Sequence, residues 1–429
     1  METYGKILLI AMPAFLFLVL FEKWYGWLRG RDTVRTMDMI SSLSSGVTNV
    51  TKDVLGLSVA IISYGWLERH MALTHVKGTW LTYLVAFLAL DFAGYWTHRI
   101  QHVVNLFWNG HIIHHSSEEF NLACALRQSI SSIVRVFVVL LLPAALLGVP
   151  QQVIAVVAPL HLFAQFWYHT RHIGKMGWLE KWLVTPSHHR VHHAINPEYI
   201  DRNYGQILIL WDKWFGTFQP ELDGVPAVYG ITRPAHTWNP IRINFQHAWL
   251  LLQDAWQTRN WRDKWRIWFM PTGWRPADVA ASRPVHKIRD VYDFEKYAPP
   301  APATLQAWSW LRLTVLLLLV SYLFAHIAAI NALDPTYIYL YGLIIFLEVY
   351  AYTELMDRNR YALAPELVKT AVALWLIYYT GDWFGAGRQW PEVPKLLAGY
   401  FLLATLVTAW FSWQQRREAA GRTAAASLS

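Results

Sequence analysis

Three histidine clusters constrain how this chain can fold more than any other feature of its sequence. They are HxxxH at His98 and His102, HxxHH at His111, His114 and His115, and HxxHH at His189, His192 and His193. On a helix, residues three and four positions apart share one face, so each cluster aims its ring nitrogens toward one point. Imidazole is a good ligand for transition metals. A lone HxxxH is most often coincidence, but these eight histidines exceed the need of one metal ion and suffice for two.

Long apolar runs occupy most of the remaining chain. Of the 429 residues, 55% are hydrophobic and 25 are tryptophan. Candidate spans lie at 6–27, 45–67, 79–97, 308–329, 335–355, 365–381 and 394–413, and the block 129–170, divided by Gly148 and Pro150, reads as a hairpin of two more. Because a membrane-spanning helix needs roughly 20 apolar residues, we expect an all-α, polytopic membrane protein with about nine spans. The first span is expected to be retained, since no clear signal-cleavage site follows it.

The basic residues between these runs predict an orientation in the membrane. They gather after the first, seventh and ninth spans, as at Arg29, Arg358 and Arg416. Since cytoplasmic loops carry an excess of Lys and Arg, the N-terminus is expected outside and the C-terminus inside. The same order places all three histidine clusters, and with them a dinuclear metal site, at the cytoplasmic membrane surface. This sorting explains the net charge of +8 without a nucleic-acid partner.

A proline-rich segment divides the chain. Residues 297–303 read YAPPAPA, which cannot form a regular helix. We therefore expect a catalytic membrane domain over residues 1–300 and a four-helix membrane region over 301–429. Residues 256–268 interleave tryptophan with Arg and Lys, which favours a position at the membrane interface over base stacking. Cys124 is the only cysteine, so no intramolecular disulfide and no CxxC metal motif can form.

Further polar residues lie on the spans that lead into the clusters. Asp91, two helical turns before His98, either faces the metals or bonds a neighbouring helix, because a carboxylate inside a membrane span needs a partner. His169, at the end of the fifth span, is a further candidate ligand. His161 and His188 are expected to support the ligands from outside.

Other polar residues follow the second cluster directly. Glu118, Glu119 and Asn121 either orient the ligand imidazoles, as metal-bound histidines usually require, or form a solvated loop. Arg127 and Gln128 are candidates for lining the entrance for substrate or cofactor. An all-histidine site supplies no electrons itself, so oxygen chemistry there needs an external electron donor. The sequence holds no nucleotide-binding glycine motif for an internal one.

The sequence around the clusters resembles the fatty acid hydroxylase/sterol desaturase superfamily, whose members are membrane di-iron oxygenases. The likeness lies in DFAGYWTHR at 91–99 and the three histidine motifs after it. The stretches ALRQS at 125–129, QFWYHT at 165–170 and LWDKWFGTF at 210–218 point to the branch that oxidises glyceryl ethers. The resemblance implies that the eight clustered histidines are iron ligands, with His169 a further candidate, and that no other side chain is catalytic.

The same resemblance implies a reaction on a membrane lipid. The carbon next to an ether oxygen would be hydroxylated with O2 and tetrahydrobiopterin, after which the hemiacetal falls apart into an aldehyde and glycerol. Arg171 and His172 depart from the pattern of the branch, as does the Lys and Arg content of residues 256–296, which leaves the pterin contacts and head-group preference open.

Three other functions stay open on the sequence. A sterol or fatty-acyl hydroxylase or desaturase of the same superfamily would carry the same histidines. A metal transporter should place its ligands at the bilayer midplane on broken helices, whereas these clusters follow the span ends. An open zinc site in a hydrolase usually has three protein ligands and a nearby carboxylate base, which is fewer than eight histidines. The sequence therefore favours a lipid monooxygenase.

Overall fold

The computed structural model describes residues 2–426, which are predominantly helical, as the sequence predicts. The helices are α1 (Glu2–Leu28), α2 (Thr36–Val54), α3 (Tyr64–Met71), α4 (Trp80–Val103), α5 (Asn105–Trp108), α6 (Ile112–His115), α7 (Leu142–Leu146), α8 (Gln151–Phe163), α9 (Pro186–His192), α10 (Leu210–Trp214), α11 (Pro240–Gln257), α12 (Trp261–Arg266), α13 (Ala277–Ser282), α14 (Ala303–Leu333), α15 (Tyr337–Met356), α16 (Leu363–Thr380) and α17 (Val393–Ala426). Short 3-10 helices lie at Cys124–Leu126, Phe137–Leu141, Gly177–Lys181 and Ala386–Arg388. Within these residues, the strands β1 (Val59–Ala60) and β2 (Val134–Arg135) form one short parallel pair.

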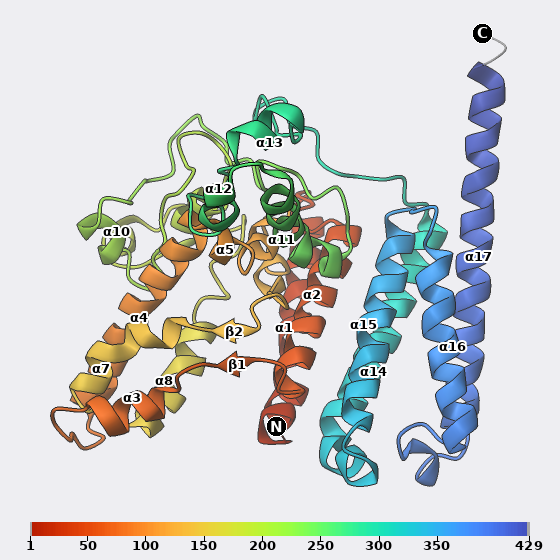
Figure 1. Cartoon of the computed structure of the whole chain (residues 1–429), viewed down its shortest axis with the longest axis horizontal. Helices are drawn as coiled ribbons and strands as arrows, with labels where there is room; N and C mark the ends of the chain where they lie inside the picture. Colours follow the sequence, from red (N-terminus) through yellow and green to blue (C-terminus); the bar gives the residue numbers. More distant parts are fainter. Residues whose placement is uncertain (1, 427–429) are drawn as a thin grey trace.

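Two groups of helices lie on either side of α1. Figure 1 shows α14–α17 side by side on the right, and α3, α4, α7 and α8 together on the left. α14 packs against α15 and also against α1 and α2. Phe15 of α1 in turn lies against Phe163 of α8, with ring centroids 5.6 Å apart, so α1 joins the two groups. One apolar core runs through this junction and includes Leu43, Val320, Phe324 and Ile345. A second, smaller core lies between α3, α4, α7 and α8.

Four helices of the described residues are long and apolar enough to cross a membrane: Tyr4–Leu28, Ala303–Leu333, Tyr337–Met356 and Val393–Glu418. They support an integral membrane protein, because each has at least the roughly 20 residues that a span needs. The expected count of nine spans is not confirmed. α4 and α16 coincide with two of the expected spans, but α4 carries Asp91 and α16 carries Glu366 and Lys369.

Three of the predicted spans, the run 45–67 and the two expected within 129–170, are not spanning helices, and those predictions are wrong. The run 45–67 breaks after α2 ends at Val54, where Gly56 takes φ +68°, and continues as β1 and α3. The block 129–170 contains β2, a 3-10 helix and the short helices α7 and α8. Its apolar residues pack against α3 and α4 in the smaller core. An apolar run alone cannot distinguish a spanning helix from short buried elements.

The proline-rich segment before the C-terminal helices is irregular, as the sequence predicts. Residues 283–302 contain no helix or strand, and α14 begins at Ala303 directly after the proline-rich stretch. Trp256, Trp261 and Trp265 on α11 and α12 are 86%, 67% and 69% exposed, and their position at a membrane interface stays a prediction. Figure 1 places α11, α12 and the start of α5 at one end of the molecule, away from the N-terminus.

Candidate metal centre

Nine buried or half-buried histidines converge in two groups within the described residues. The first group is His98, His102, His111, His115 and His192, and the second is His114, His169, His189 and His193. Within each group, one nitrogen of every ring lies within 4.8 Å of the others. The structure thus brings together the eight clustered histidines and His169. Each HxxHH motif is shared between the groups, since its first and last histidines go to one group and the middle one to the other.

Short helices present these rings. His98 and His102 lie one turn apart at the end of α4, whose start is capped by the Thr79 side chain. α6 carries the last two histidines of the second cluster. α9 carries the third cluster and begins at Pro186, in the first-turn position that proline favours. His169 lies in the irregular segment after α8.

The Nε2 atoms of the first group face one another. The Nε2 atom of His111 lies 3.0 Å from that of His98 and 3.1 Å from that of His115, and His115 lies 3.1 Å from His102. Two nitrogens bound to one ion at about 2.1 Å are about 3.0 Å apart in octahedral geometry and about 3.4 Å apart in tetrahedral geometry. The first group therefore has the spacing of ligands around one metal ion.

The second group has the same geometry. The Nε2 atom of His189 lies 2.8 Å from that of His169 and 3.0 Å from that of His193, and His169 lies 3.4 Å from His114. The two groups are adjacent, because the stacked rings of His115 and His193 have centroids 4.3 Å apart. The arrangement can hold two neighbouring ions.

The charge state of the rings suits metal binding. Burial, reinforced by repulsion from neighbouring rings, holds the pKa far below its usual value for His111, His114, His115, His189, His192 and His193. Burial lowers the pKa of His169 to about 4. Neutral imidazoles are metal ligands. Among the described residues, Nε2 of His192 is buried without any hydrogen-bond partner, which a bound cation would satisfy.

Main-chain carbonyls fix the tautomers of two rings of the first group, His98 and His192. Nδ1 of His98 donates to the carbonyl of Tyr204 at 2.9 Å, and Nδ1 of His192 donates to the carbonyl of Arg202 at 2.9 Å. A carbonyl can only accept, so the proton stays on Nδ1 and the Nε2 lone pair faces the group. These bonds orient the rings before any metal binds.

These acceptors come from the segment 201–204, at residues 202 and 204, which the spacing of the histidines does not predict. Asp201 and Asn203 adopt left-handed backbone at φ 58° and 57°, and the carboxylate of Asp201 lies 3.7 Å from Nδ1 of His102. The buried carboxylate of Asp212 accepts from the backbone N–H of Tyr204 at 2.8 Å and so holds the segment in place. The one signal in the sequence was the pair of residue types that tolerate left-handed backbone.

Arg127 supports the second group through its backbone. Nδ1 of His114 donates to the carbonyl of Arg127 at 3.3 Å. The guanidinium is buried and donates to Asp38 at 2.7 Å, to Ser42 at 2.9 Å and to Ser116 at 2.9 Å. The side chain therefore ties α2 to the second cluster and does not line an opening.

Asp91 and His161 belong to neither group. The fully buried Asp91 carboxylate accepts from Nε2 of His161 at 2.8 Å, from the indole N–H of Trp211 at 2.8 Å, and from the backbone of Ile207 at 2.9 Å and of Leu208 at 3.1 Å. Of the two alternatives for Asp91, the structure has the one in which it bonds a neighbouring segment. The carboxylate joins α4 and α8 to the region before α10.

Glu118 and Glu119, the acidic pair after the second cluster, are buried, so this segment is not a solvated loop. Glu119 pairs with Arg35 at 3.0 Å, Arg171 at 2.7 Å and Lys296 at 2.7 Å. Burial raises the pKa of Glu118 to about 7. Through Glu119, three distant segments are tied to the second cluster.

The remaining candidates have local partners. The side-chain oxygen of Asn121 accepts from the backbone N–H of Ala123 at 3.0 Å, and Nδ1 of His188 donates to the carbonyl of Leu183 at 3.2 Å. The exposed Gln128 donates to the carbonyl of Ala125 at 3.1 Å. These contacts stabilise the turns that carry the clusters.

Comparison with known proteins defines the class of this site. The model of the fatty acid hydroxylase family matches residues 83–217, a range that holds all nine histidines of the two groups. The protein is therefore an oxidoreductase of the lipid-monooxygenase class, and the family together with the histidine groups indicates iron as the metal. No solved structure matches the chain.

The relatives narrow this class further. The chain is 32% identical to alkylglycerol monooxygenase of Homo sapiens over 412 residues. This alignment covers 95% of the chain and 89% of the human protein. It is 36% identical to the alkylglycerol monooxygenase of Xenopus tropicalis, over 72% of this chain and 69% of that one, and 39% identical to that of Danio rerio, over 64% and 61%. The chain belongs to the alkylglycerol monooxygenase family.

Proposed function

We propose that this protein is a di-iron monooxygenase that cleaves the ether bond of alkylglycerols, with one iron ion in each histidine group. The observation that carries the proposal is the division of nine histidines into two adjacent groups, each with the nitrogen spacing of a single metal site. All nine would be iron ligands through Nε2. The substrate is proposed from the relatives, which are named alkylglycerol monooxygenases.

Iron bound at these histidines would supply the activation of O2, with electrons from an external donor. The protein contributes orientation and shielding. Nδ1 bonds such as that from His192 to Arg202 hold the rings with their lone pairs toward the ions. Aromatic rings cover the site and keep bulk water away from it. The ring centroid of Tyr168 lies 4.3 Å from that of His189, and the ring centroid of Phe120 lies 5.2 Å from that of His193.

The overall reaction balances with a two-electron donor, which we propose to be tetrahydrobiopterin. One oxygen atom of O2 enters a C–H bond of the carbon next to the ether oxygen, and the other leaves as water with two electrons and two protons from the donor. The resulting hemiacetal then breaks its bond between that carbon and the glycerol oxygen. Its hydroxyl proton passes to the glycerol oxygen, which releases a fatty aldehyde and glycerol.

We further propose that residues 1–300 form the catalytic unit, that residues 301–429 form a membrane region attached to it, and that the site faces the cytoplasm. The basic residues Arg29 and Arg358, which follow α1 and α15, and Arg416, in the last part of α17, support this side. A site at the membrane surface suits a lipid whose ether carbon lies just below the glycerol. A carbon deep in a sterol or acyl chain would need a tunnel.

An aldehyde assay tests the proposal. Purified, iron-loaded protein receives a 1-O-alkylglycerol, O2 and reduced tetrahydrobiopterin, and we expect release of the fatty aldehyde. The matched control is the ester analogue, monoacylglycerol, which should give none. Hydroxylated sterol or acyl product without aldehyde from any ether lipid would instead assign the protein to the sterol or fatty-acyl hydroxylases.

A further inference from the structure

A pocket of about 160 Å³ lies beside the first histidine group and has no part in the reaction described above. Its lining comes from α5, α6 and α11, from residues 231–233 and from residues 272–287. Trp108 lines the pocket and also packs on the metal centre, with its ring 5.1 Å from that of His102 and 5.6 Å from that of His115. The indole is thus a wall shared by the pocket and the metal centre.

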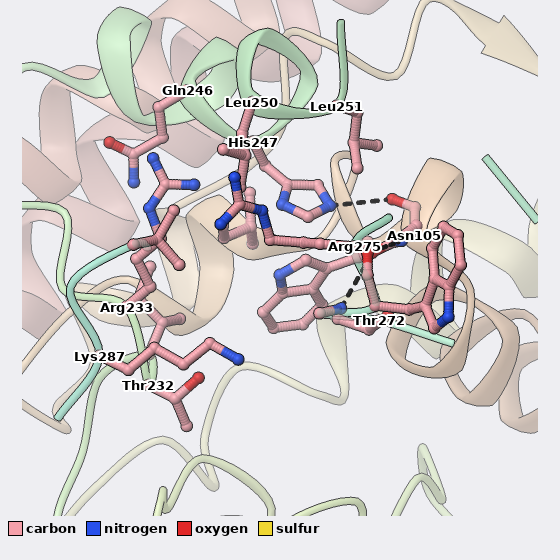
Figure 2. Close-up of a pocket in the computed structure, with 16 residues that line it drawn as sticks. Asn105, Thr232, Arg233, Gln246, His247, Leu250, Leu251, Thr272, Arg275 and Lys287 are labelled. Atoms are coloured by element: carbon pink, nitrogen blue, oxygen red, sulfur yellow. Dashed lines mark hydrogen bonds between the residues drawn. The ribbon is translucent and has the colours of Figure 1, made fainter. Parts of the chain in front are cut away.

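Three cationic side chains line the pocket, and no carboxylate is among its described lining residues. Figure 2 draws the guanidinium groups of Arg233 and Arg275 at the level of the His247 ring and the ammonium group of Lys287 lower in the view. Arg275 is neutralised by Asp254, at 2.5 Å from Nε and 2.8 Å from Nη2. Within the described residues, Arg233 and Lys287 make no hydrogen bond or ion pair.

Two further groups define the character of the pocket. The hydroxyl of Thr272 is buried without a hydrogen-bond partner in the described residues. Nε2 of His247 donates to the carbonyl of Asn105 at 3.1 Å, and burial lowers the pKa of this histidine to about 4, so the ring is neutral near pH 7. The unpaired charge at the pocket is therefore the two positive charges of Arg233 and Lys287.

We propose that this pocket binds a phosphate group. A phosphate carries up to two negative charges, matches the fork of an arginine, and accepts hydrogen bonds from ammonium and hydroxyl groups. The volume exceeds the roughly 30 Å³ share of a water molecule several times over and so admits such a group. Arg233 is half-buried and Lys287 is exposed, and an anion between them would give both cations a partner of opposite charge.

The phosphate has two possible sources, the head group of a lipid or free phosphate. This assignment rests on the proposed function and extends it. The phosphate then belongs to a glyceryl ether lipid whose head group lies in the pocket. The glycerol backbone would then pass the Trp108 wall toward the metal centre. The pocket would thus select phosphate-bearing ether lipids over neutral ones.

Equilibrium binding without turnover tests the assignment. Binding is measured by calorimetry in one detergent, without reductant, for inorganic phosphate, a short-chain 1-O-alkylglycerol 3-phosphate and the neutral alkylglycerol of the same chain. We expect the phosphate-bearing lipid to bind at least about tenfold more tightly than the neutral one. Arg233→Gln and Lys287→Gln should each raise the Kd of the phosphate-bearing lipid about tenfold and leave the Kd of the neutral lipid unchanged.

Arg289→Gln is the matched control, because Arg289 is exposed on the same segment and does not line the pocket. It should change neither Kd. Inorganic phosphate that binds as tightly as the lipid, and loses affinity in the same two variants, would assign the pocket to free phosphate. Equal affinity for both lipids, with no binding of inorganic phosphate by the wild-type protein, would overturn the assignment. If the wild-type protein binds the phosphate-bearing lipid but releases no aldehyde from any ether lipid, only the proposed function is refuted.

Discussion

His98 donates from Nδ1 to the main-chain carbonyl of Tyr204 across 2.9 Å, although the two residues lie 106 positions apart in the chain. This bond joins the end of α4 to the segment after the third histidine cluster. It fixes the proton on Nδ1, so that Nε2 of the ring is free to bind a metal. The orientation of the first histidine group therefore depends on a segment that holds none of its ligands.

Asp212→Asn tests this dependence. One Asp212 oxygen accepts from the backbone of Tyr204 at 2.8 Å and the other from Gly205 at 2.7 Å, and an amide can accept at only one of them. We expect iron affinity to fall about 10- to 100-fold, as it does when other partners of metal-bound histidines are removed. Iron titration followed by metal analysis measures the effect.

The control for this variant is Asp223→Asn, since the Asp223 side chain is 97% exposed and pairs only with Lys175 among the described residues. It should bind iron as the wild type does. Unchanged iron affinity in Asp212→Asn would show that the segment does not orient the ligands.

A buried ion cluster is expected to hold the C-terminal helices together. Arg312 of α14 pairs with Glu348 of α15 at 2.6 Å and with Glu366 of α16 at 3.1 Å, and Lys369 pairs with both glutamates. All four side chains are fully buried. Arg312→Met leaves a net negative charge without water, and removal of one partner of such a cluster costs about 3–5 kcal/mol. Thermal unfolding in detergent measures the loss.

Lys395→Met is the comparison, because Lys395 is 76% exposed and pairs with Glu392, itself 69% exposed. A surface pair of this kind contributes about 1 kcal/mol at most. If Arg312→Met unfolds at the same temperature as Lys395→Met, the cluster does not stabilise the bundle.

Glu118→Gln should stabilise the protein in a pH-dependent way. Burial raises the pKa of Glu118 in the folded protein to about 7, above its usual 4.5. The folded state therefore binds the proton more tightly than the unfolded state, and the wild type loses stability as pH rises from 4.5 to about 7. The glutamine variant avoids this loss, so it should gain up to about 3 kcal/mol over wild type at pH 8 and nothing at pH 4.

Melting temperatures at both pH values measure the difference, with the exposed Glu295→Gln as control. The control should differ little from the wild type at either pH. A Glu118→Gln variant that is less stable than the wild type at pH 8 would contradict the prediction and would mean that the charged carboxylate is needed there.

The local part of the site could be predicted from the sequence. Helical spacing puts His189 and His193 on one face, and the structure places both in one group. The same rule does not show that His192, between them, turns to the other group. It also cannot show that Arg202 supplies its acceptor, because that contact depends on how the chain returns after α9.

The membrane part was less predictable, and the reason is physical. An apolar run indicates burial but not whether lipid or protein does the burying. The run 45–67 is apolar because α3 packs on α7 and α8, and the chain turns at Gly56 before a span can form. The charged cluster around Arg312 could not be foreseen either, since its members lie on three different helices, α14, α15 and α16.

The iron content of the active protein tests the central claim most directly. Protein prepared under reducing, iron-replete conditions should hold one iron for each histidine group, that is, two per chain. His192→Ala and His193→Ala, which alter one ligand in each group, should each lower the iron content while the chain stays folded. Fully active wild-type protein with a single iron per chain, or both variants with undiminished iron, would contradict the account.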